Sequence, residues 1–367
     1  MADRIYSIDS MRIIAMVFVV AIHTNLFRGI GAYGNAANFV VDSFGRFVVP
    51  FFFMASGFFF ALKTLNRDST RYFLKQVTNI ASLYVFGLLL AAPVFLGGGT
   101  TESDSQSDQI ITNSANELAG FLSPVELLYY GNSVSVILWF LPALIFSLTF
   151  VYIFDAINKT KHLIPVSLGF HCIGLLGASY TMFVNIPFEV RDALFFGFFY
   201  TSLGYYLYAL DWQPSTERSK LYLTATAFFA VLHVGERYVL GYILTGDSIS
   251  HSVYTASYTI GTALFTISLF VFLLSRPNLG KGTSLPSWGK YAVGIYVVHP
   301  AVLYPLERMD WVLYQMGYDV SNTLFWHLTL TFGTFFGALF VYILARKLGA
   351  IKKVQLTIQR PTFSRTN

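Results

Sequence analysis

Long apolar stretches alternate with short polar segments along almost the whole chain. Each apolar stretch is close to the roughly 20 residues that a helix needs to cross about 30 Å of hydrocarbon. The pattern therefore predicts an all-α integral membrane protein, one domain (1–367) folded as a single bundle of about ten transmembrane helices. The predicted spans are 12–30, 39–62, 73–96, 134–156, 163–184, 193–210, 221–243, 253–275, 291–308 and 323–346.

Two of these spans are weaker than the others. The span 221–243 contains Glu236 and Arg237, and the span 291–308 is short and contains Pro300. Non-helical backbone at membrane depth is tolerated only where protein or water covers it. Either span is therefore a candidate for a re-entrant or broken helix.

The composition agrees with a membrane protein. The chain is 55% hydrophobic and only 12% charged, and its mean hydropathy is +0.57. An ordinary soluble domain is about 25% charged. This chain has too few charges to cover a surface that faces water, so we expect the lipid bilayer to surround it.

The basic residues predict which ends of the helices face the cytosol, because short loops rich in Lys and Arg resist translocation. If both termini are cytosolic, 19 of the 24 Lys and Arg lie in cytosolic segments, among them the basic tail 349–367. The net charge of +5 is then a topology signal spread over separate loops, and we expect no nucleic-acid partner. The five basic residues left on the other side are all arginines: Arg28, Arg46, Arg191, Arg237 and Arg308.

The longest loop, 97–133, holds several acidic residues and no Lys or Arg. By the same rule it is an extracytosolic loop.

Few ionisable groups lie inside the predicted helices, and such groups are costly enough to mark function, a pathway or a buried pair. Arg12 and His23 are eleven residues apart on the first predicted helix, which places them on one face about 16 Å apart along the axis. Arg12 is expected at the cytosolic boundary and His23 near the bilayer centre. The alternative is that Arg12 only anchors the topology and His23 is a core histidine bonded to a neighbouring helix.

His299 and Ser56 are expected at a similar depth. His299 lies nine residues past Lys290 on a helix that enters from the cytosol, and Ser56 lies ten residues from Arg46 on a helix that enters from outside. A neutral imidazole at that depth can act as a general base on a hydroxyl, with a second histidine or Ser56 helping to orient it. Ser56 and Gly57 can instead form a small-residue contact between helices.

These residues lie in motifs that resemble acyltransferase family 3, the multispan O-acyltransferases that modify cell-envelope glycans. The chain looks most like the enterobacterial-common-antigen O-acetyltransferase branch. The matching features are IDSMR with Arg12, the Arg-x10-His pair, RFVVPFFFMASGF from Arg46 to Phe58, LWFL with Trp139, and GIYVVH ending at His299. They occur in matching order over nearly the whole chain.

The resemblance implies a multi-pass protein of the inner (cytoplasmic) membrane. It would move an acyl group, expected to be acetyl, from cytosolic acyl-CoA to a hydroxyl of an extracytosolic glycan or lipid-linked sugar. His23 would be the catalytic base, assisted by Ser56 and His299, and Arg12 a donor-site residue. Arg46 and Trp139 are the candidate substrate-binding residues.

The family's basic loop after the second helix corresponds to Arg67, Arg71 and Lys75. Arginine forks bind phosphate through paired hydrogen bonds and lysine adds a point charge, which suits the phosphates of coenzyme A. The alternative is that these residues only hold the loop in the cytosol.

Other classes of protein have less support. The sequence has no Cys/His cluster with zinc spacing, so we expect no metal. It has no GxxxxGK[ST] and no GxSxG, so nucleotide hydrolysis and the serine-hydrolase route have no support. We expect no permanently bound cofactor. A transporter or glycan flippase stays open, although proton-coupled carriers usually place acidic residues in the membrane interior. An acyltransferase that N-acetylates or lipidates its acceptor, or a purely structural or partner-binding role, also stays open. The acyl group, the glycan, a direct or covalent route and the oligomeric state are not fixed by the sequence.

Overall fold

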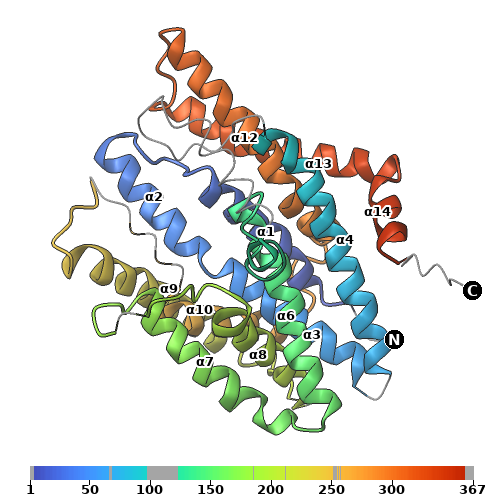
Figure 1. The fold of residues 1–367 in the computed structure, drawn as a ribbon. Helices are drawn as coiled ribbons and strands as arrows, with labels where there is room; N and C mark the ends of the chain where they lie inside the picture. The colour runs from blue at the N-terminus through green and yellow to red at the C-terminus, as the bar shows by residue number, and fades with distance from the viewer. Residues whose placement is uncertain are drawn as a thin grey trace, which may run out of the picture.

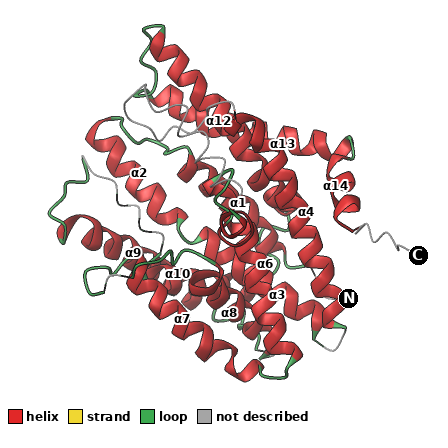
Figure 2. Ribbon diagram, viewed as in Figure 1, coloured by secondary structure: helices red, strands yellow, loops and turns green. Residues whose placement is uncertain are grey.

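The computed structural model describes residues 4–65, 68–96, 123–184, 186–210, 212–250, 254, 256 and 258–359. Within these ranges every regular element is a helix and no strand occurs (Figure 2). Six helical stretches are long and apolar enough to cross a membrane: Tyr6–His23, Gly31–Thr64, Ser69–Pro93, Val136–Ala156, Thr160–Ala178 and Leu324–Lys347. The predicted all-helical, multi-pass membrane protein is confirmed. The count of ten spans and the cytosolic position of both termini stay predictions.

Figure 1 shows how the helices are arranged. In chain order the longer ones are α1 (Tyr6–His23), α2 (Gly31–Gly45), α3 (Val48–Thr64), α4 (Ser69–Leu96), α6 (Phe140–Ala156), α7 (Leu163–Ala178), α8 (Phe198–Ala209), α9 (Ser219–Tyr238), α10 (Ile260–Ser275), α12 (Ala292–Gln315), α13 (Leu324–Lys347) and α14 (Ala350–Gln359). The shorter ones are η1 (Glu126–Tyr130), η2 (Val136–Trp139), η3 (Thr160–His162), η4 (Ala193–Gly197), η5 (Val239–Ile243), α11 (Leu285–Trp288) and η6 (Gly289–Tyr291).

The first helix occupies the middle of the bundle. It contacts α2, α3, α10, α11, α12 and α13, and its residues Ile8, Met16 and Val20 are fully buried. Around it, α3 packs along α8, α9 packs along α10, and α12 packs along α13 (Figure 1). A ligand that follows α1 can therefore meet side chains from most of the other helices.

The predicted position of the first helix was wrong at both ends. It begins at Tyr6 and ends at His23, whereas the sequence predicted 12–30. It ends there because Asn25 and Phe27 adopt positive φ angles of 47° and 71°, which are incompatible with a right-handed helix. His23 is therefore the last residue of its helix and not a residue halfway along it.

The predicted span 39–62 consists of two helices. α2 ends at Gly45 and α3 begins at Val48. Pro50 has no N–H to donate to the carbonyl of Arg46, four residues earlier, so the regular ladder of hydrogen bonds cannot pass this point. Arg46 consequently lies at a helix junction.

The two weak spans are helical throughout. The span 221–243 is α9 followed directly by the π-helical turn η5. The span 291–308 falls almost entirely within α12, which continues through Pro300 and Pro305. Glu236 has a structural partner, since its Oε2 accepts a hydrogen bond of 2.7 Å from the N–H of Gly261 in the first turn of α10. Neither span is interrupted by non-helical backbone.

Glycines allow α3 and α8 to pack with their backbones in contact. A Cβ atom added at Gly57 would lie 1.9 Å from the carbonyl oxygen of Thr201, and one added at Gly204 would lie 1.9 Å from that of Met54. Helix interfaces in membranes are rich in small residues for this reason. Gly57 therefore forms the contact between helices that the sequence offered as the alternative role of Ser56 and Gly57.

We predict that Gly57→Ala destabilises the protein by about 1–3 kcal/mol, because the two backbones must move apart to admit the methyl group. Thermal unfolding in detergent measures this effect. The matched control is Gly235→Ala, since no atom lies within 4 Å of a Cβ at Gly235 in α9. An unfolding temperature of Gly57→Ala equal to that of the wild type would contradict the close packing.

Candidate active site

A cavity of about 90 Å³ lies beside the last turn of α1. His23, Arg46 and Trp139, which are far apart in the sequence, all line it. Arg191 and Tyr296 complete its polar wall, and the rest of the lining is mostly aliphatic and aromatic. The structure thus brings together three of the residues that the sequence singled out as candidate catalytic or substrate-binding groups.

His23 is paired with His299. Their ring centres are 5.3 Å apart, with 38° between the ring planes. His299 is fully buried, and its Nδ1 lies 2.7 Å from the carbonyl oxygen of Tyr296. A carbonyl only accepts hydrogen bonds, so Nδ1 carries the proton and Nε2 carries a lone pair. Among the residues that the structure describes, this Nε2 has no hydrogen-bond partner.

The dipeptide His299-Pro300 explains how His299 is held. Pro300 lacks the N–H that would bond to the carbonyl of Tyr296 four residues earlier. That carbonyl is therefore free to accept the bond from the His299 ring. The hydroxyl of Tyr296 donates to the carbonyl of Ile137, which fixes α12 against η2. Backbone and side chain of Tyr296 together orient the second histidine.

Arg46 is held by an acidic residue of α2. Its Nε and Nη2 lie 3.0 and 2.7 Å from the two carboxylate oxygens of Asp42. This two-point ion pair fixes the plane of the guanidinium group. Arg46 therefore presents its positive charge to the cavity in one orientation.

Arg191 is a second arginine in the cavity wall. Its guanidinium carbon lies 5.2 Å from the centre of the Trp139 ring, within the range of a cation–π interaction. Burial lowers the pKa of Arg191, and the nearby charge of Glu189 opposes that effect. Within the described part of the chain its guanidinium forms no ion pair, so its charge is available to a ligand.

A second, larger cavity of about 530 Å³ adjoins the first and shares Arg191 with it. Its other walls are the end of α7, residues 186–190 and Ala256. The segment that precedes η4 ends at Asp192. This residue anchors it by accepting hydrogen bonds from the Tyr129 hydroxyl at 2.7 Å and from the Phe195 N–H at 2.8 Å. Under the predicted topology this larger cavity opens on the extracytosolic side.

An apolar space of about 20 Å³ also adjoins the His23 cavity, at lining residues other than Arg191. The two spaces share Val19, Val49, Phe140 and Tyr296 as lining residues, so they are adjacent. Arg12, Met16, Val19 and His23 follow one face of α1 at helical spacing. This face leads from Arg12 through the apolar space to His23.

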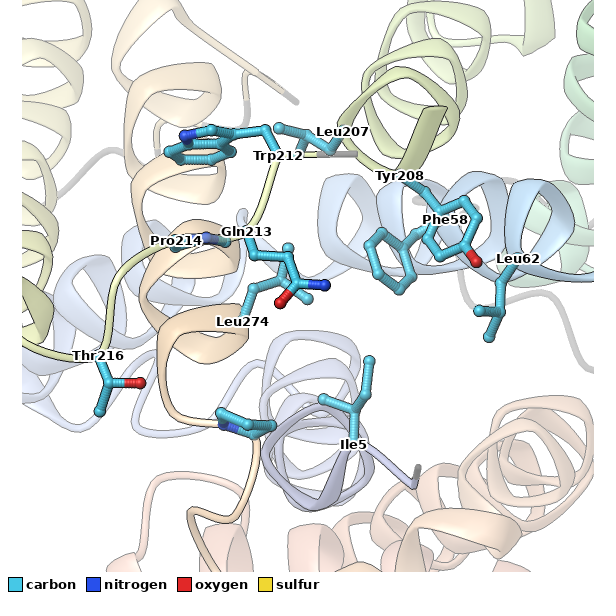
Figure 3. Close-up of a pocket in the computed structure, with 11 residues that line it drawn as sticks. Ile5, Phe58, Leu62, Leu207, Tyr208, Trp212, Gln213, Pro214, Thr216 and Leu274 are labelled. Atoms are coloured by element: carbon cyan, nitrogen blue, oxygen red, sulfur yellow. The ribbon is translucent and has the colours of Figure 1, made fainter. Parts of the chain in front are cut away.

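A pocket of about 380 Å³ lies near the start of α1, at the end of the protein that is predicted to be cytosolic. Figure 3 shows Ile5, Phe58 and Tyr208 around it and the amide of Gln213 reaching into it. Trp212 and Leu274 form further walls. This pocket is separate from the His23 cavity, and none of the described residues that line it is basic.

Arg12 lies between that pocket and the apolar space along α1. Its Nη1 is 3.0 Å from Asp9 Oδ1, and its guanidinium carbon is 4.9 Å from the centre of the Phe59 ring. Arg12 is thus partly neutralised and does not line the His23 cavity.

The remaining predicted site residues lie elsewhere. Ser56 is not in the lining of the His23 cavity, and its hydroxyl donates to the Phe52 carbonyl at 2.8 Å in its own helix. Arg71 and Lys75 are exposed near the start of α4. Arg67 lies outside the described residues.

Arg191 is a member of the site that was not predicted from the sequence, where it served only as a marker of topology. One signal was present, because the five basic residues on the predicted outer side are all arginines and include Arg46, Arg191 and Arg237. Arginine is favoured over lysine where a cation must be buried, stacked or bonded at two points. That bias was a hint of a site on this side.

Comparison with known proteins gives two kinds of match. A family described as an acyltransferase domain matches residues 5–346 of this chain. The chain is also similar to two proteins of Enterococcus faecalis named amino-acid racemase. One is 30% identical over 244 residues, which cover 61% of this chain and 30% of that relative. The other is 22% identical over 320 residues, which cover 83% of this chain and 42% of that relative.

The chain therefore spans less than half of the length of either racemase. Their named activity belongs to proteins much longer than the part that resembles this one. No solved structure matches the chain. Because the family match runs over nearly the whole chain, the protein is a multi-pass membrane protein that belongs to acyltransferase family 3.

Proposed function

We propose that the protein is an O-acyltransferase that moves an acyl group from cytosolic acyl-CoA to a hydroxyl of an extracytosolic cell-envelope glycan. The observation that supports this most strongly is the position of His23. It lies between an apolar space that follows α1 and a larger cavity bordered by Arg191. Donor and acceptor can approach such a histidine from opposite sides, so neither has to cross the membrane completely.

The donor would bind from the cytosolic end. The pocket near Ile5 offers Trp212 and Tyr208 for stacking with a base, and the Gln213 amide for hydrogen bonds. Arg12 would meet the polar part of the donor on its way along α1, and Arg67, Arg71 and Lys75 would supply charge for its phosphates. The apolar space holds only about 20 Å³, so its side chains must move apart when the acyl arm enters.

The chemistry is a proton transfer coupled to acyl transfer. A neutral His23 takes the proton of the acceptor hydroxyl while the hydroxyl oxygen attacks the thioester carbonyl. The tetrahedral intermediate collapses when the carbon–sulfur bond breaks, which leaves an ester on the acceptor. The thiolate then takes a proton from the His23 imidazolium, giving free CoA and restoring the base.

His299 would orient His23. Its Nε2 lone pair can accept a hydrogen bond from the N–H of the His23 ring, which leaves the other nitrogen of His23 as the base. The structure favours direct transfer over an acyl-enzyme on Ser56, because the Ser56 hydroxyl is bonded within α3 and away from the cavity. Ser56 then acts through helix packing.

Arg46 and Arg191 would stabilise the negative charge that develops on the thioester oxygen. Fixed donors in a site that excludes water are effective because they need not reorganise during the reaction. Trp139 supplies a flat apolar surface for a sugar ring next to Arg191. A cavity of about 90 Å³ has room for only a few water-sized groups, which favours a short acyl group such as acetyl.

We predict that His23→Gln lowers the rate of acyl transfer by about 10²–10⁴-fold, because the amide cannot act as a base. The protein should insert and unfold like the wild type. Transfer of labelled acyl groups from acyl-CoA to envelope glycan, measured by mass spectrometry, checks this result.

The control for this variant is His162→Gln, since His162 is exposed in η3, away from the cavity. Full transfer by His23→Gln would exclude His23 as the base. A trapped acyl group on His23 or Ser56 in the wild type would instead indicate a covalent route.

We further predict that Val293→Trp blocks the donor, because Val293 lines the apolar space and is 41% exposed, so a larger ring can enter without breaking the core. The apparent KM for acyl-CoA should rise at least about tenfold, equivalent to about 1.4 kcal/mol. Val17→Trp is the matched control, because Val17 on α1 is 44% exposed and does not line the space. Equal donor KM values in the two variants would place the acyl arm elsewhere.

A further inference from the structure

We propose that Arg237 is a positioning residue for the transfer reaction: it holds the Asp42 carboxylate, and through it the Arg46 guanidinium, in the His23 cavity. Arg237 itself does not line that cavity. The inference rests on the proposed function, in which Arg46 stabilises developing negative charge.

Arg237 is the largest fully buried side chain of the described part of the protein, with 0% exposure. Its Nε donates to Ser43 Oγ at 3.0 Å, its Nη1 to the Ala256 carbonyl, and its Nη2 to Asp42 Oδ2 at 2.7 Å. The Tyr254 ring lies against the guanidinium at 4.9 Å. All three nitrogens are therefore bonded, and the group has one available orientation.

Asp42 connects the two arginines. Its Oδ2 accepts hydrogen bonds from Arg237 at 2.7 Å and from Arg46 Nε at 3.0 Å, and its Oδ1 accepts from Arg46 Nη2 at 2.7 Å. Without Arg237 the carboxylate could rotate about its own side-chain bonds and take Arg46 with it. With Arg237 in place, both oxygens are fixed and Arg46 Nη1 is left for the cavity.

The surroundings argue against Arg237 as a simple support for α9. That helix already has polar anchors to two neighbouring helices: Glu236 accepts from the Gly261 N–H of α10 at 2.7 Å, and His233 Nε2 donates to the Ser43 carbonyl of α2 at 2.9 Å. Burying a charged group costs several kcal/mol, and hydrophobic residues of similar volume in place of a whole buried ion pair commonly serve stability as well or better. A buried arginine aimed at a carboxylate that also binds Arg46 is better explained by orientation.

The test is a double-mutant cycle with the wild type, Arg46→Lys, Arg237→Met and the double variant. Each is measured for acyl transfer from acyl-CoA to envelope glycan. We expect Arg237→Met to lower kcat at least about tenfold with little change in donor KM, since only a transition-state interaction is lost. The double variant should be no slower than the slower single variant, because both changes remove the same contact.

Glu236→Gln is the matched control, because it removes a charge next to Arg237 that binds α10 and not Asp42. It should lower the unfolding temperature but leave kcat unchanged. Arg237→Lys should recover part of the lost kcat, since lysine can still donate to Asp42. Wild-type kcat in Arg237→Met, or rate losses that multiply in the double variant, would overturn the proposal.

The unfolding temperatures of the same four proteins test the connection without any activity. Shifts that are smaller in the double variant than the sum of the single shifts are expected if Asp42 couples the two arginines. Additive shifts would overturn the coupling whatever the chain transfers. If the wild type transfers no acyl group, the proposed function is refuted. The thermal cycle then still tests whether Asp42 couples Arg237 to Arg46. Should Arg237→Met fail to fold, Arg237→Lys and Asp42→Asn complete the cycle.

Discussion

The candidate active site depends on backbone hydrogen bonds that two prolines remove from helices beside it. In a membrane, a helix normally satisfies its own N–H and C=O groups, because lipid cannot. Pro50 interrupts the ladder at Arg46, so that this arginine lies at the junction of α2 and α3. Pro300 releases the Tyr296 carbonyl, which then holds the His299 ring at 2.7 Å. In the first place Arg46 is left in the wall of the cavity at the end of α1, and in the second the ring of His299 is held beside that of His23.

The second requirement is that buried charges stay compensated. Asp42 lies between Arg46 and Arg237, so these three side chains together carry one net positive charge. Arg191 adds another, with the Trp139 ring as its neighbour and no ion pair within the described residues. A cavity walled in this way is suited to a group that becomes negative during reaction. In the proposed reaction, neutral histidines beside it would supply the base without adding to the positive charge.

Much of the fold was predictable because membrane helices must be apolar over most of their length. The all-helical class and the continuity of α13 followed from that pattern. The end of α1 was not predictable from hydrophobicity, since it depends on the backbone angles of Asn25 and Phe27. The break between α2 and α3 depends on Pro50. A hydrophobicity average over many residues does not show the effect of a single proline.

The candidate site was predicted in part. His23, Arg46, Trp139 and His299 come from motifs that the sequence displays, and the structure places them around or next to one cavity. Arg191 was missed as a lining residue, and Asp42 and Arg237 were missed as neighbours of Arg46, because nothing in their local sequence shows which helix they approach. Ser56 was misplaced because depth along a helix does not say which way a side chain points.

In the proposed reaction, acyl-CoA and the acceptor meet at His23 from opposite sides of the membrane. Sealed proteoliposomes that hold the acceptor glycan inside, with acyl-labelled CoA added only outside, test this arrangement. We expect labelled ester on the enclosed glycan and no acyl-CoA in the lumen. Labelling that occurs only when donor and acceptor share one compartment would contradict it.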